Sequence, residues 1–177
     1  MNISFNSITP VHAERIYHKS LEEYILAPIK PAAYVLGKVL AAVLRRLLSS
    51  VIILLLAFGF GANLHLSLWL LMVLILNAII FAEVGFIAAM KISTYEEMSQ
   101  VNTYILLPMS FLCGTFFTTQ ALPTALRCFI EMLPLTHTST LLRSLAAGEG
   151  LAGLSLLILL LYAAAGFVIS RRVFPAP

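Results

Sequence analysis

The chain has 177 residues, of which 60% are hydrophobic and 11% are charged, and its mean hydropathy is +0.98. A soluble domain of this length cannot bury so much apolar surface, so the composition predicts an integral membrane protein. The formal net charge of +3 comes without basic runs interleaved with aromatic residues, which argues against nucleic-acid binding. Cys113 and Cys128 lack His or Cys neighbours at metal-ligand spacing. We therefore expect no metal site and interpret both cysteines as packing residues, with a disulfide as the minority alternative.

The N-terminal segment carries polar and charged residues without an apolar run, so we expect no cleavable signal peptide. A helix over residues 13–26 would place four residues on one apolar face: Tyr17, Leu21, Tyr24 and Ile25. Around that face lie Glu14, Lys19, Glu22 and Glu23. This pattern predicts an amphipathic helix. Pro28 and Pro31 would end it and turn the chain toward the first membrane span.

Four apolar stretches approach the roughly 20 residues that are needed to cross the hydrocarbon core. They predict spans over residues 34–60, 66–90, 101–119 and 151–170. The first span carries Lys38, Arg45 and Arg46 in its cytoplasmic half, where long side chains can reach the lipid head groups. The predicted fold is all-α, a polytopic membrane helix bundle. Its domains are a cytoplasmic amphipathic segment, residues 1–33, and a transmembrane domain, residues 34–177.

The distribution of Lys and Arg predicts the orientation in the membrane, because basic residues near span ends are retained in the cytoplasm. With a cytoplasmic N-terminus, nine of the 11 basic residues lie inside: Arg15, Lys19, Lys30, Lys38, Arg45, Arg46, Lys91, Arg171 and Arg172. Arg127 and Arg143 lie outside. Both termini are then cytoplasmic, and residues 121–150 form an excursion on the outer face.

The stretch from Leu107 to Arg143 is interrupted by prolines too often for an ordinary span. A proline leaves backbone groups unpaired, so such backbone near bilayer depth must be buried in protein or lie at the interface. We therefore expect short re-entrant or interfacial helices on the outer face. Pro108 and Gly114 would shape the span at residues 101–119, either as a gate hinge or simply through helix packing.

Glu83 is the one acidic residue inside a predicted span. A carboxylate near the middle of a bilayer is costly unless it is paired or hydrated, so it should face protein or a cavity. One interpretation is a residue of a transport pathway or a proton-titrating group. The other is a hydrogen bond to a neighbouring helix, with Asn77 as a polar companion.

The acidic and basic side chains of the outer excursion do not form a catalytic pattern. Glu131, His137 and Arg143 occur without a nucleophile in a recognised turn and without zinc-ligand spacing, so we expect no catalytic residues. Arg143 is interpreted as a head-group contact. Thr136 and His137 are expected to satisfy the backbone groups that Pro134 leaves unpaired.

Several motifs resemble, in their order and spacing, the permeases of ABC type 2 transporters. They are Ser20 to Ile29 (SLEEYILAPI), Leu36 to Leu40 (LGKVL), Tyr95-Glu96-Glu97, Leu107-Pro108, Phe111-Leu112, Gly114 to Phe117 (GTFF), Leu122-Pro123, Pro134 to His137 (PLTH) and Arg143. Lys19-Ser20 stands where such permeases often have Gly-Thr. The family usually has two spans ahead of the amphipathic helix, so the chain corresponds to the C-terminal four of six spans.

The resemblance implies an exporter subunit driven by a separate ATPase. Gly37-Lys38 is followed by Val39 without an upstream glycine, so this chain shows no phosphate-binding loop and is not expected to be an enzyme. ATP and magnesium would bind the partner ATPase, and a second permease copy would complete the pathway in a bacterial inner membrane. The residues implied to contact the ATPase are Glu14, Tyr17, Leu21, Glu22, Glu23 and Tyr24, with residues 91–100 as a second contact. The alternative for the amphipathic helix is that it lies on the lipid surface and does not contact an ATPase.

The residues implied for the pathway or its gate are Glu83, Pro108, Gly114, Pro134, Thr136, His137 and Arg143. The substrate would be a drug, a lipid or a polysaccharide. Two other functions remain open: a truncated permease that acts as a membrane scaffold without transport, and a proton-coupled carrier that uses Glu83.

Overall fold

The structure is a computed structural model that describes residues 2–16, 31–61, 67–112, 130–146 and 153–174. All regular elements in these ranges are helical, as predicted: α1 (Asn2–Asn6), α2 (Thr9–Ile16), α4 (Pro31–Gly59), α5 (Leu68–Lys91), α6 (Tyr95–Val101), the π-helical segment η1 (Asn102–Leu106), α7 (Leu107–Leu112), α9 (Pro134–Ala146) and α10 (Gly153–Val173). The prediction of an all-α membrane helix bundle is confirmed.

Three of the described helices are long and apolar enough to cross a membrane: Ala32–Gly59 within α4, Leu68–Lys91 (α5) and Gly153–Val173 (α10). They coincide with the spans predicted at residues 34–60, 66–90 and 151–170. The span predicted at residues 101–119 falls partly on the continuous helical path of α6, η1 and α7. Its remainder, with Gly114, lies outside the described residues.

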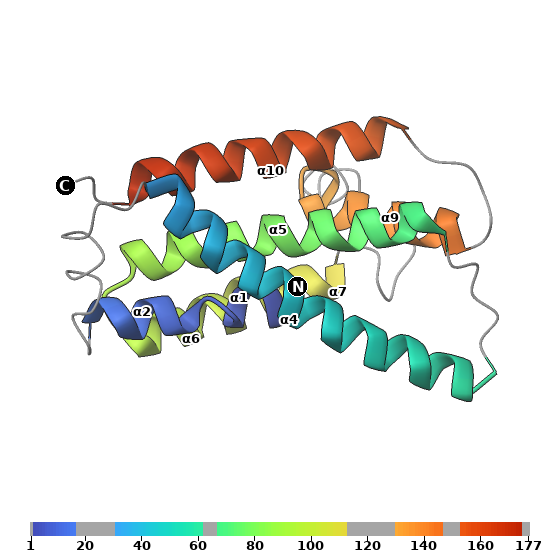
Figure 1. Ribbon diagram of the computed structural model, residues 1–177, viewed down its shortest axis with the longest axis horizontal. Helices are drawn as coiled ribbons and strands as arrows, with labels where there is room; N and C mark the ends of the chain where they lie inside the picture. Colours follow the sequence, from blue (N-terminus) through green and yellow to red (C-terminus); the bar gives the residue numbers. More distant parts are fainter. Residues whose placement is uncertain (1, 17–30, 62–66, 113–129, 147–152, 175–177) are drawn as a thin grey trace.

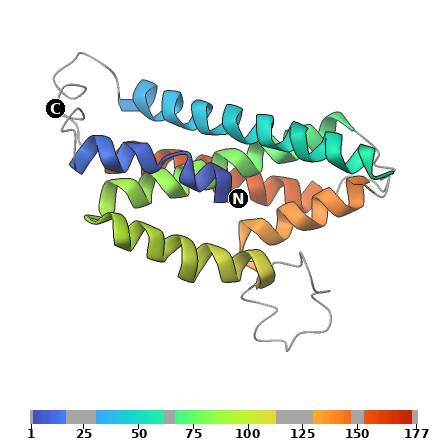
Figure 2. The same ribbon diagram turned by 90° about the horizontal axis from the view of Figure 1, so that it is seen from below.

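Helix α5 lies at the centre of the bundle, between α10 on one side and α1, α2 and α6 on the other, and α4 crosses it obliquely (Figure 1). We call the two ends of the bundle the Leu68 end and the Lys91 end, after the first and last residues of α5. Helix α4 begins at the Lys91 end, and α2 and α10 both end there, as Figure 2 also shows. Helix α9 lies beside α5 in the half nearer the Leu68 end.

The short helices α1 and α2 are part of the same hydrophobic core as the long helices. Phe5, Ile8 and Val11 are each at most 1% exposed and pack in one cluster with side chains of α4 and α5. Helix α1 approaches α5 closely, since a Cβ at Gly85 would lie 3.0 Å from the carbonyl oxygen of Phe5. The sequence does not indicate this packing, because polar residues interrupt the apolar ones in these helices. The domain boundary at residue 33 stays a prediction.

A second hydrophobic cluster fixes α9 in the bundle. Leu141 and Leu145 of α9 pack against Leu70 and Val73 of α5 and Leu159 of α10. Helix α9 is therefore a packed part of the bundle, and whether it is re-entrant or interfacial stays a prediction.

The helical path from α6 to α7 changes to a π-helix just before Pro108. The N–H of Leu107 donates to the carbonyl of Asn102, five residues back. Proline has no N–H for the carbonyl four residues back, and its ring would collide with that carbonyl in a regular α-helix. The wider π turn relieves this collision, so Pro108 produces a local change of helix type, and π turns of this kind are frequent at functional sites.

Candidate functional site

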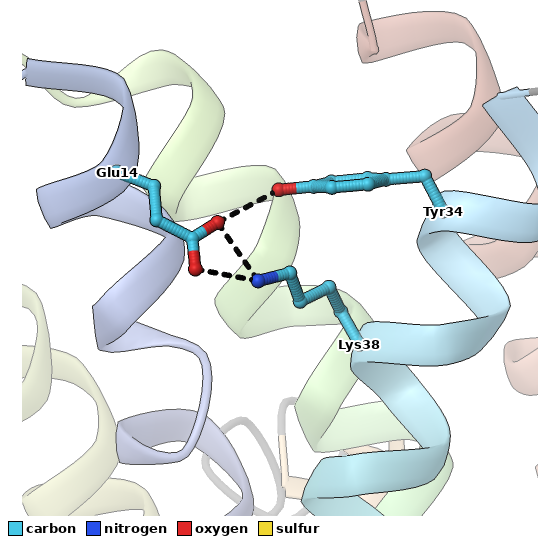
Figure 3. Close-up of polar contacts among 3 residues, drawn as sticks. All are labelled: Glu14, Tyr34 and Lys38. Atoms are coloured by element: carbon cyan, nitrogen blue, oxygen red, sulfur yellow. Dashed lines mark hydrogen bonds and ion pairs between the residues drawn. The ribbon is translucent and has the colours of Figure 1, made fainter. Parts of the chain in front are cut away.

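A polar junction joins α2 to α4 at the Lys91 end of the bundle (Figure 3). The Nζ of Lys38 donates to both carboxylate oxygens of Glu14, at 2.6 Å and 2.8 Å. The hydroxyl of Tyr34 donates to Oε2 of the same carboxylate at 3.0 Å. Tyr34 and Lys38 are one helical turn apart on α4, so both side chains reach the same point on α2. We call these three residues the junction.

The Tyr34 ring extends the junction to two further helices. Its centroid lies 4.9 Å from that of Phe174, just past the end of α10, and 6.3 Å from that of Phe86 on α5. The Lys38 Nζ lies 5.4 Å from the Tyr34 centroid, which adds a cation–π contact. The ends of α2, α4 and α10 are thus held together with α5 around one tyrosine.

In the sequence, the junction residues lie on both sides of the segment that contains most of the predicted ATPase contacts. Glu14 lies in the last turn of α2 and Tyr34 in the first turn of α4. Tyr17, Leu21, Glu22, Glu23 and Tyr24 lie outside the described residues. Within the described residues, the carboxylate of Glu14 binds this chain's own Lys38 and Tyr34. Its predicted contact with an ATPase stays a prediction.

Two basic side chains of α4 contact groups of α1 and α2, and the contact with lipid head groups that the sequence suggested stays a prediction. Lys38 pairs with Glu14, and Nη1 of Arg46 lies 3.5 Å from Oγ of Ser4 on α1. The reason is that α1 and α2 pack beside α4 and offer an acid and a hydroxyl at these positions. The one signal for this in the sequence is the i, i+4 spacing of Tyr34 and Lys38.

Glu83 lies in the middle of α5 and is 2% exposed. Its carboxyl group faces Gly166 of α10, and a Cβ at that glycine would collide with Oε2. Among the described residues, Oε2 has no hydrogen-bond partner. The polar companion suggested by the sequence is engaged elsewhere, because Nδ2 of Asn77 donates to Oγ1 of Thr138 on α9 at 2.9 Å.

The residues around Pro134 form hydrogen bonds that fix the start of α9. Proline cannot donate to the carbonyl of Ile130, and the Thr136 hydroxyl donates to it at 2.6 Å. Ring nitrogen Nε2 of His137 lies 2.9 Å from the carbonyl oxygen of Glu131, and Nδ1 lies 3.4 Å from Oγ of Ser155 on α10. These are the backbone interactions expected for Thr136 and His137.

The pathway candidates do not form one site. Glu83 lies between α5 and α10, His137 lies between α9 and α10, and Pro108 lies on α7. Arg143 is exposed in the last turn of α9. No group of three or more His, Cys, Asp or Glu residues in the described part of the chain is placed to hold a metal ion. Cys113 and Cys128 lie outside the described ranges.

Comparison with known proteins identifies the family. The model of the ABC-2 type transporter family matches residues 1–147. The chain belongs to this family. Its members are transport permeases, that is, membrane subunits without a nucleotide-binding domain of their own, and they generally work with an ATPase subunit. The chain is accordingly a multi-pass membrane protein of the transport-permease class.

Curated relatives include permeases from several bacteria. The chain is 25% identical over 108 residues to the inner membrane transport permease YadH of Escherichia coli K12, covering 60% of this chain and 42% of YadH. It is 32% identical over 101 residues to nodulation protein J of Bradyrhizobium diazoefficiens, covering 56% of this chain and 38% of the relative. The chain therefore spans about two fifths of the length of these relatives. No solved structure matches it significantly.

Proposed function

We propose that the chain is the membrane permease subunit of an ABC type 2 exporter, which moves a drug, lipid or polysaccharide outward when a separate ATPase hydrolyses ATP. The family match over residues 1–147 supports permease function. The observation that carries the coupling proposal is the junction, because it ties both ends of the predicted ATPase-contacting segment to the spans.

The junction gives a physical route from an ATPase to the spans. A displacement of residues 17–30 pulls on Glu14 at one end and on the start of α4 at the other. The two ends are linked by the ion pair, so α2 and α4 move together. Tyr34 contacts Phe86 and Phe174, so the same displacement reaches α5 and α10. Rigid helices that share one packed contact transmit such shifts along their length.

The proposed complex has further parts outside this chain. ATP and magnesium bind the ATPase subunit, and a second permease copy completes the pathway. The name of the relative YadH supports placement in a bacterial inner membrane. The excess of basic residues at the Lys91 end, where α5 ends at Lys91 and α10 ends with Arg171 and Arg172, supports a cytoplasmic location of that end.

The first experiment tests ATPase association. The tagged chain is co-expressed with an ABC-type ATPase subunit, and the complex is purified in mild detergent. The double reversal Glu22→Lys with Glu23→Lys should remove the ATPase from the purified complex, because it inverts the charge of the proposed contact. Glu149→Lys, on the predicted outer excursion, is the matched charge-reversal control. Undiminished association of the double variant would contradict the coupling proposal.

The second experiment tests the junction by exchanging its charges. Glu14→Lys and Lys38→Glu should each lower substrate-stimulated ATP hydrolysis in proteoliposomes about fivefold, as expected for an interaction worth about 1 kcal/mol. The double exchange should restore most of the loss, because the ion pair forms again with its charges exchanged. ATPase association is measured in all three variants, so that a loss of coupling is distinguished from a loss of binding. Normal association without stimulation by any substrate would favour the non-transporting scaffold, the alternative left open by the sequence.

A further inference from the structure

A cleft of about 340 Å³ lies between α4, α5 and α10, with Glu83 among its lining residues. Its walls are apolar side chains at helical spacing, among them Val39 and Val43 of α4, Ile75 and Ile79 of α5, and Phe167 of α10. Glu83 continues the α5 stripe one turn beyond Ile79 and is the one charged residue in the lining. The volume is at the low end of the range of small-molecule sites, about 300–1,000 Å³.

The carboxyl group of Glu83 is held at the edge of this cleft by the backbone of α10. Gly166 has no side chain, and any Cβ there would occupy the position of Oε2. The carboxyl group is buried, yet no described residue satisfies Oε2. Burying such a group without a partner is costly. Oε2 itself is buried against Gly166, but Glu83 lines the cleft, so a hydrogen-bond donor that enters the cleft can reach the carboxyl group and offset part of this cost.

We propose that this cleft binds a small amphiphile that carries an amine: the apolar body lies among the α4, α5 and α10 side chains, and the amine donates to the Glu83 carboxyl group. An amine supplies hydrogen-bond donors and is a base with which a carboxyl group can form an ion pair, and the apolar walls accept the apolar body of the ligand. A packed transmembrane helix is a poorer occupant, because a cleft of this volume holds a few side chains and not a helix. The proposal deepens the proposed function by naming a substrate class for it and rests on that function only for the step from binding to transport.

The test compares two ligands of equal chain length. Binding of tritium-labelled decylamine and of decanol to the full chain in phosphatidylcholine nanodiscs is measured against nanodiscs without protein, which corrects for partition into lipid. The wild type should bind the amine about tenfold more tightly than the alcohol, because an ammonium group forms a charge-assisted hydrogen bond with the carboxyl group whereas the hydroxyl forms a weaker neutral one. Equal affinities would overturn the proposal.

Three variants locate the effect. Glu83→Gln and Gly166→Ala should each bring the ratio of amine to alcohol affinity close to one while decanol binding is kept, the first by removing the ionisable carboxyl group and the second by displacing it. Gly153→Ala lies on the same helix, and its added Cβ meets no atom within 4 Å, so the ratio should stay at the wild-type value. Far-UV circular dichroism and elution volume verify that each variant folds. An unchanged ratio in Glu83→Gln overturns the proposal.

The outcome also separates this proposal from its alternatives. If cross-linking shows that Glu83→Gln changes the number of subunits while the affinity ratio stays at the wild-type value, the cleft holds a helix of a second copy and the proposal fails. The binding assay uses no ATPase. Failure of ATPase association with intact amine preference therefore overturns the proposed function alone, and the reverse result overturns the amine site alone.

Discussion

Two neighbouring positions of α5, Glu83 and Gly85, lie on faces of the helix that differ in packing density. At Gly85 the backbone of α1 lies so close that a Cβ would be 3.0 Å from the Phe5 carbonyl oxygen. At Glu83 the helix faces α10 and the cleft, and a buried carboxyl oxygen has no partner among the described residues. Residues two apart on a helix point roughly 200° away from each other. The side of α5 at Gly85, which packs on α1, is called the filled face, and the side at Glu83, which borders the cleft, is called the hollow face.

The difference indicates which part of the bundle is built for stability and which is left open for binding. On the filled face, Phe5, Ile8 and Val11 are fully buried, and the carboxylate of Glu14 accepts from two side chains. On the hollow face, apolar walls surround one unsatisfied carboxyl group. Proteins tolerate unsatisfied buried groups mainly where function requires them. The following substitutions test this division, from the largest expected effect to the smallest.

A side chain at position 85 should disrupt the filled face. Gly85→Val forces α1 away from α5, because the nearest atoms are backbone and cannot rotate aside, and the expected loss of unfolding free energy is about 3 kcal/mol. Chemical unfolding in mixed micelles measures it. Gly37→Val on α4 is the control, since its added Cβ meets no atom within 4 Å. Equal losses for the two variants would show that α1 does not pack on α5 as described.

On the hollow face, a substitution should raise the free energy of unfolding instead of lowering it. Glu83→Met replaces an unpartnered carboxyl group with an apolar side chain of similar length, so the unfolding free energy should rise by about 2 kcal/mol. The same unfolding assay measures it, with Ile79→Met as the control for adding a flexible side chain to the cleft. A loss of stability in Glu83→Met would mean that the carboxyl group has a protein partner, and the division between the two faces would fail.

Much of the fold follows from the sequence because long apolar runs have few alternatives in a membrane. The helices at residues 66–90 and 151–170 were predicted to within a few residues. The burial of α1 and α2 was not predicted, because Asn2 to Asn6 and Thr9 to Ile16 alternate polar and apolar residues. Their apolar side chains become informative only when α5 lies beside them, and contact between helices far apart in sequence cannot be read from local periodicity.

The contacts of the candidate site residues also fall into those that could be predicted from the sequence and those that could not. Pro134, Thr136 and His137 interact with nearby backbone, so their hydrogen bonds could be predicted from the chemistry of proline. The ion-pair partner of Glu14 and the packing neighbour of Glu83 could not be predicted, because Lys38 is 24 residues from Glu14 and Gly166 lies on α10. The sequence did not indicate that the carboxylate of Glu14 binds α4, and its contact with an ATPase stays a prediction.

The junction belongs to the filled face and should show a smaller effect than Gly85. Glu14→Gln keeps the shape but removes the charge opposite Lys38, so the unfolding free energy should fall by about 1 kcal/mol, a value already reduced for the partial exposure of both side chains. Unfolding at low and high salt measures it. Glu96→Gln, exposed in the first turn of α6, should change stability by less. Independence of the Glu14→Gln effect from salt would argue against an ion pair.

The smallest effect concerns the hydrogen bond that holds α9 beside α5. A double-mutant cycle of Asn77→Ala and Thr138→Val isolates the 2.9 Å bond from Nδ2 to Oγ1. Hydrogen bonds between membrane helices average about 0.6 kcal/mol in such cycles, so a coupling free energy of that size is expected. The pair Asn77→Ala with Tyr162→Phe is the control: Tyr162 donates to the carbonyl of Met132 and does not share a bond with Asn77, so the coupling should be near zero. Coupling near zero for the first pair would show that apolar packing alone holds α9 beside α5.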